Sequence, residues 1–101
     1  LSCGVPSKLA WNILQEEASD FMTIPETLVS TTMKILANPF GGDEYIEAGE
    51  SAIAGLAALL AAARQPEFVR KLALDSSSQV VVIGTEGPTD PDIYESLVHG
   101  T

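Results

Sequence analysis

The chain has 101 residues, of which 46% are hydrophobic, and it carries a formal net charge of -9. This length and composition are typical of one globular domain with a modest core and argue against disorder. Clustered Lys and Arg are needed to bind phosphate-rich surfaces, so we expect neither nucleic acid nor a membrane as a partner.

The chain has a single cysteine, Cys3, which cannot form an internal disulfide. A disulfide-stapled secreted domain is therefore not expected, and a reducing, cytoplasmic setting fits best. No positively charged stretch opens the sequence, so we expect no signal peptide. The longest apolar run, residues 52–63, is too short to span a bilayer. The first residue is Leu rather than Met, which suggests a chain cut from a longer one.

The first half of the chain predicts two helices separated by a short strand. Ser7 is the expected N-cap of a helix over residues 8–19, where apolar residues recur at helical spacing. The apolar run 21–24 predicts a brief buried strand. A second helix is expected from about Pro25, because proline suits a first helical turn. The breaker cluster at residues 38–43 predicts a loop.

The middle of the chain predicts an unusual helix over residues 52–64, with Ser51 as its N-cap. Nearly every residue in this helix is Ala, Leu, Ile or Gly. A helix that is apolar on all sides is normally buried on several sides. Because 101 residues can hardly surround it, we expect part of its cover to come from another chain or from further sequence.

The last third of the chain predicts two helices around the main strand. A fourth helix is expected over residues 66–74, and the β-branched run 80–83 predicts a fully buried, parallel strand. Asp90 is the expected N-cap of a last helix, with Pro91 as its first residue. This alternation predicts an α/β fold with three layers, in which helices flank a short, mostly parallel sheet. So few strands indicate that residues 1–101 form a single domain or a partial one.

Two positions offer groups that could bind a ligand. Gly49, Glu50 and Ser51 lie before the apolar helix, where free backbone N–H groups and the helix dipole attract anions. Plain N-capping by Ser51 is the alternative interpretation. The sequence Gly-Thr-Glu-Gly at 84–87 follows the β-branched run, and ligands of open α/β sheets collect at the ends of strands. A glycine-rich turn is the alternative there. The single histidine, His99, supports neither a metal site nor a Ser-His-Asp set.

Several short motifs can also be compared, in order and spacing, with a known family. They are Leu1-Ser2-Cys3-Gly4-Val5-Pro6-Ser7, Ala10-Trp11, Ile13-Leu14, Ile35-Leu36-Ala37-Asn38-Pro39, Gly42-Asp43, Gly49-Glu50-Ser51, Thr85-Glu86-Gly87 and Thr89-Asp90-Pro91. Together they resemble the last quarter of diaminopropionate ammonia-lyases, over essentially the whole chain. The resemblance implies the C-terminal portion of an enzyme dependent on pyridoxal phosphate (PLP) that is related to the tryptophan synthase β-subunit. It also implies that the chain forms part of the large domain of a fold type II PLP enzyme.

This resemblance implies a homodimeric lyase that removes a β-substituent from a small amino acid and releases ammonia and pyruvate from 2,3-diaminopropionate. It implies that Thr85 contacts the pyridine nitrogen of PLP, with Ser51 as the second candidate. Gly49, Glu50 and Gly87 are further cofactor-binding residues implied by the same motifs. The chain departs from the family at two positions, Gly84 where Ser is frequent and Ala52 where Gly is common.

The reacting groups of that family are not among these motifs. The Schiff-base lysine, an asparagine and a glycine-rich phosphate loop would all precede Leu1, and none of Lys8, Lys34 and Lys71 lies in a similar context. The resemblance therefore implies one wall of a cofactor site and a chain that is inactive alone, with the remainder of the subunit as its partner. A non-catalytic assembly or binding module, and part of a threonine or serine dehydratase, are the alternatives.

Overall fold

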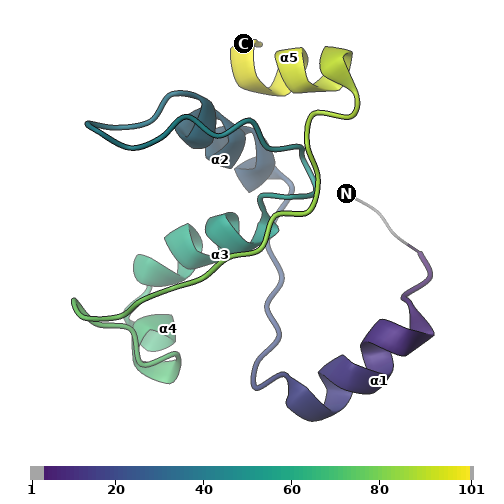
Figure 1. The fold of residues 1–101 in the computed structure, drawn as a ribbon. Coiled ribbons are helices and arrows are strands. Elements are labelled where there is room, and N and C mark those ends of the chain that lie inside the picture. Colours follow the sequence, from purple (N-terminus) through teal and green to yellow (C-terminus); the bar gives the residue numbers. More distant parts are fainter. Residues whose placement is uncertain (1–3, 101) are drawn as a thin grey trace.

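The computed structural model describes residues 4–100, so Cys3 and the first part of the N-terminal motif lie outside it. Within this range the chain forms five helices, which are α1 (Lys8–Glu17), α2 (Thr27–Ala37), α3 (Ala54–Ala63), α4 (Pro66–Lys71) and α5 (Pro91–His99). Helix α2 packs against α3 and α5, and α3 packs against α4, whereas α1 contacts none of the other four (Figure 1). None of these helices has the length and hydropathy needed to cross a bilayer.

The predicted three-layer α/β arrangement with a parallel sheet is wrong, because the described residues contain no strand. Residues 80–83 follow an extended path (Figure 1), but no described segment pairs with them, and the Val81 side chain is 87% exposed. The segment 21–24 also lacks a pairing partner. A strand exists only where a neighbouring backbone completes its hydrogen bonds. The β-branched composition of residues 80–83 correctly predicted an extended backbone. It wrongly predicted that this backbone pairs with another strand.

The N-caps predicted for the first and last helices are confirmed. The Ser7 hydroxyl accepts a hydrogen bond from Ala10 N at 3.3 Å, at the start of α1. Asp90 Oδ1 accepts one from Ile93 N at 3.1 Å, at the start of α5. Both caps satisfy backbone N–H groups that an isolated helix end leaves unpaired. The loop predicted at residues 38–43 is also present, with Gly41 at a φ of 57°.

The N-cap predicted for the apolar helix is wrong. Helix α3 begins at Ala54, and its N-cap position is Ile53, whose side chain makes no cap hydrogen bond. Ser51 lies in a turn before the helix, where Ala52 N donates to Gly49 O at 3.0 Å. The chain closes this turn first, so the Ser51 side chain does not lie at the helix start.

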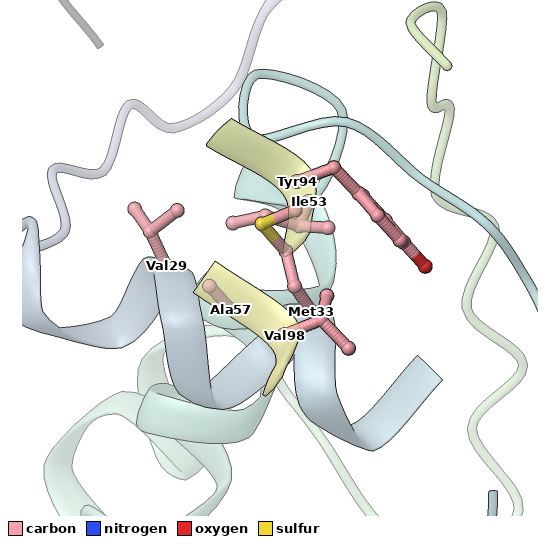
Figure 2. Close-up of a cluster of buried hydrophobic side chains, with 6 residues drawn as sticks. All are labelled: Val29, Met33, Ile53, Ala57, Tyr94 and Val98. Atoms are coloured by element: carbon pink, nitrogen blue, oxygen red, sulfur yellow. The ribbon is translucent and has the colours of Figure 1, made fainter. Parts of the chain in front are cut away.

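The core is small and lies where α2, α5 and the start of α3 meet (Figure 2). Its buried side chains are Val29, Met33, Ile53, Ala57, Tyr94 and Val98. Within α3 itself only Ala57 and Ala62 are buried. The described chain therefore leaves most of the apolar helix partly uncovered.

Candidate functional site

The two candidate segments, 49–51 and 84–87, meet beside the start of α3. Gly49 N donates a hydrogen bond to the backbone oxygen of Glu86 at 3.0 Å. Ser51 N donates to the carboxylate oxygen Oε1 of Glu86 at 3.4 Å. Figure 1 shows the segment that leads into α5 passing the start of α3. The structure thus joins, into one junction, two stretches that the sequence predicted separately.

Glycine is required in this junction because the two backbones approach closely. A Cβ atom on Gly49 would collide with the carbonyl oxygen of Gly87 and would lie 2.7 Å from Glu86 Oε1. A backbone oxygen cannot swing aside as a long side chain can, so any side chain at this position would push the segments apart. Gly49 itself is buried, as this close approach requires.

The two departures from the family pattern lie against each other at the same junction. A Cβ atom on Gly84 would lie 3.4 Å from the Ala52 Cβ and 3.2 Å from the Ala52 carbonyl oxygen. The contact with the Ala52 methyl group is an ordinary van der Waals contact, and the tighter one is with a backbone oxygen that any residue at position 52 would have.

The predicted cofactor residues present polar groups that the described chain does not satisfy. Ser51 and Thr85 are exposed, and neither hydroxyl is hydrogen-bonded within residues 4–100. Glu50 is partly buried, and its Oε2 atom is buried with no hydrogen-bond partner among the described residues. An unpaired buried carboxylate oxygen is costly. The Glu50 carboxylate therefore suits a donor that residues 4–100 do not supply.

Glu86 joins the two segments, although it is not among the predicted cofactor-binding residues. It lies inside the Thr85-Glu86-Gly87 motif, in which only the first and last residues are predicted to bind the cofactor. The structure shows that Glu86 makes both hydrogen bonds between the two segments. The signal in the sequence for Glu86 is a carboxylate between a hydroxyl and a glycine. Its hydrogen-bond partner Ser51 lies 35 residues earlier, and the spacing of the motifs does not indicate that contact.

A cavity of about 240 Å³ opens beside the junction. Its wall is formed by Leu36 of α2, by side chains at the start of α3 and by residues of the segments 46–48 and 82–86, in which Glu47 and Glu86 contribute carboxylates. None of the five predicted cofactor residues lines this cavity. In addition, residues 4–100 contain no group of three or more His, Cys, Asp or Glu side chains that could hold a metal ion.

Comparison with known proteins supports the predicted resemblance, although no family model matches the chain. The chain is 39% identical over 101 residues to the diaminopropionate ammonia-lyase of Escherichia coli K12, covering 97% of this chain and 25% of that protein. The Salmonella typhimurium diaminopropionate ammonia-lyase is 36% identical over 102 residues, with the same coverage. The chain matches a quarter of a diaminopropionate ammonia-lyase. The resemblance predicted from the motifs is thus confirmed.

Solved structures of the Escherichia coli diaminopropionate ammonia-lyase share the fold of this chain. The holo form superposes with a TM-score of 0.86 at 38% identity, covering 97% of this chain and 26% of that one. The complex with an aminoacrylate-PLP azomethine reaction intermediate gives a TM-score of 0.85 at 39% identity, covering 97% and 27%. PLP, predicted as the cofactor of the complete enzyme, is thus confirmed for this relative.

Proposed function

We propose that this chain is the C-terminal portion of a PLP-dependent ammonia-lyase subunit that converts 2,3-diaminopropionate to pyruvate and ammonia. The observation that carries the proposal is the similarity of 97% of the chain to one quarter of such lyases. The remainder of the subunit would supply the catalytic lysine, so the chain alone is expected to be inactive. A homodimeric, cytoplasmic enzyme completes the proposal, in keeping with the single cysteine.

The junction residues are proposed to form one wall of the PLP site. Exposed, unengaged hydroxyls on Thr85 and Ser51 support this role, with Thr85 as the first candidate to donate to the pyridine nitrogen. A neutral hydroxyl leaves that nitrogen unprotonated, which favours elimination over transamination. PLP, when bound, supplies an electron sink for the carbanion of the amino acid. Gly49, Glu50 and Gly87 would shape the wall around these hydroxyls.

The lysines of this chain lie on α1, α2 and α4, outside the two segments that form the junction. Lys8 begins α1 and Lys71 ends α4. On α2, the ammonium group of Lys34 donates to the backbone oxygen of Gly100 at 3.5 Å. None of the three lines the cavity beside the junction. This placement supports a covalent attachment point elsewhere in the subunit.

Exposed apolar side chains support the larger subunit as the partner. Ile83 is 80% exposed, Leu9 on α1 is 75% exposed, and Phe40 in the loop after α2 is 73% exposed. Soluble monomers rarely expose large contiguous apolar patches, and such surface is normally covered by another protein element. We propose that the rest of the subunit covers these side chains.

The proposal is tested by comparing this chain with the protein from the full coding sequence that includes it. With PLP, the full protein is expected to release pyruvate and ammonia from 2,3-diaminopropionate, and residues 1–101 alone are expected to release neither. Light scattering is expected to show a dimer of the full protein. A stronger activity on threonine or serine would assign a dehydratase instead. A chain that forms a defined oligomer, indifferent to the added sequence, would favour a binding module.

A further inference from the structure

We propose that Glu86 is a positioning residue that fixes the turn 49–51 against the loop 84–87. In doing so it sets the spacing between the Ser51 and Thr85 hydroxyls. The inference rests on the proposed function and deepens it, because these two hydroxyls are the candidate donors to the cofactor ring. Glu86 would act on the cofactor through Ser51 and Thr85, without contacting it.

Two different groups of Glu86 hold the same turn. Its backbone oxygen accepts from Gly49 N at 3.0 Å, a well-formed hydrogen bond. Its carboxylate accepts from Ser51 N at 3.4 Å, a longer and weaker contact than the backbone one. Glu86 directly follows Thr85 in the chain and is hydrogen-bonded to the backbone of Ser51. It is therefore linked to both residues that carry the candidate hydroxyls.

Steric contact prevents the opposite movement. The hydrogen bonds of Glu86 keep the turn from moving away from the loop. The missing side chain of Gly49 leaves so little space that a Cβ atom there would collide with the Gly87 carbonyl oxygen. The turn is therefore restrained in both directions. Such pre-organisation is what a binding wall needs if its polar groups are to meet a ligand without rearrangement.

One oxygen of the Glu86 carboxylate already accepts a hydrogen bond from the chain itself, and Glu86 also lines the cavity beside the junction. Its Oε1 atom already accepts from the Ser51 backbone, and Glu86 is only partly exposed. The hydroxyls of Ser51 and Thr85 are both exposed and unengaged within the described residues. The two hydroxyls are thus the groups still free to donate to the cofactor, and Glu86 fixes the backbone next to both of them.

The test uses the protein from the full coding sequence, with Glu86→Ala and Glu86→Gln variants. Glu95→Ala is the matched control, because the Glu95 carboxylate is exposed on α5. In Glu86→Ala, the dissociation constant for PLP is expected to rise by about threefold to tenfold, as for the loss of one ordinary hydrogen bond. Hydrogen exchange at the Ser51 amide, which loses its acceptor, should accelerate by about the same factor, and the Gly49 amide should exchange faster because the turn loosens. Glu86→Gln, which keeps an acceptor oxygen, should show smaller changes, and Glu95→Ala none.

Visible circular dichroism of bound PLP separates positioning from plain stability. Glu86→Ala should lower this signal per bound cofactor, because a displaced hydroxyl changes the asymmetry around the ring. Unchanged dichroism and PLP affinity in a merely less stable variant would overturn the proposal. If Glu86→Ala does not fold, the same readouts on Glu86→Gln decide. A parent that binds no PLP would refute the proposed function, and amide exchange would still test whether Glu86 holds the turn.

Discussion

Among single residues, Tyr94 shows how one buried polar group can make stability depend on pH. Its ring fills part of the core, and its hydroxyl points out of the cluster (Figure 2). The hydroxyls of Tyr45 and Tyr94 lie 3.4 Å apart and share a hydrogen bond. That hydrogen bond, together with burial, raises the pKa of Tyr94 from 10.0 to about 12. The folded state therefore favours the neutral phenol.

The raised pKa predicts a loss of stability at high pH. Below pH 10 the phenol is neutral in both the folded and unfolded states, and its stabilising contribution is complete. Between pH 10 and about 12 the unfolded state releases the proton first, so the free energy of unfolding should fall. Urea unfolding across this window measures the effect. Tyr45→Phe should lower the Tyr94 pKa and weaken this dependence, and an unaltered dependence would contradict the assignment.

The candidate site shows which residue properties can be predicted from sequence. Glycines, hydroxyls and a carboxylate in short motifs marked both halves of the junction by residue type alone. The contact of Glu86 with Gly49 and Ser51 could not be predicted, because it depends on how distant segments of the fold meet. The contact between Ala52 and Gly84 could not be predicted for the same reason.

At the scale of elements, predictions succeeded where the determinants are local. Ser7 and Asp90 cap helices through groups three residues away, which the sequence displays directly. Ser51 has the same chemistry, but the turn closed by Gly49 places it before α3. The strand predicted at 80–83 failed because pairing needs a second segment, which residues 4–100 do not contain. Residue composition alone could not reveal that absence.

The difference between Asp90, which caps a helix, and Ser51, which does not, can be measured as a change in the free energy of unfolding. Asp90→Ala removes a cap from α5, which carries Tyr94 and Val98 into the core, so the free energy of unfolding should fall by about 1 kcal/mol. Ser51→Ala is the matched control, because Ser51 caps no helix here and its replacement should change that energy by less than about 0.5 kcal/mol. Urea denaturation gives both values. Equal losses would mean that Ser51 caps α3 after all.

As a whole molecule, the chain is more open than a compact domain of its length. Its accessible surface is 7772 Å², whereas a folded monomer of this mass exposes roughly 5,500 Å². Its radius of gyration is 14.9 Å, compared with about 13 Å for a compact chain of 100 residues. Helix α1 contributes to this openness, because it packs against no other described helix. Substitutions of exposed apolar residues should therefore affect contact with the rest of the subunit, whereas substitutions in the core should lower the free energy of unfolding of the chain itself.

The exposed extended segment allows the proposed cover to be tested separately from folding. Val81 is 87% exposed, so Val81→Asp should change the free energy of unfolding of this chain by less than about 0.5 kcal/mol. If the rest of the subunit covers Val81, the new carboxylate would be buried without a partner, which costs several kcal/mol. Recovery of a complex between this chain and the separately expressed remainder of the subunit should then fall sharply.

Two further variants locate the effect. Gln79→Asp adds the same charge at an exposed position two residues earlier and should leave the recovered complex nearly intact, because the apolar side chains at 80–83 are the proposed contact surface. Met33→Ala, at a core position that is 1% exposed, should instead destabilise the chain itself by about 2–5 kcal/mol. If Val81→Asp destabilised the chain as much as Met33→Ala does, its own residues would already cover Val81. If Val81→Asp left the complex unchanged, the cover would lie elsewhere.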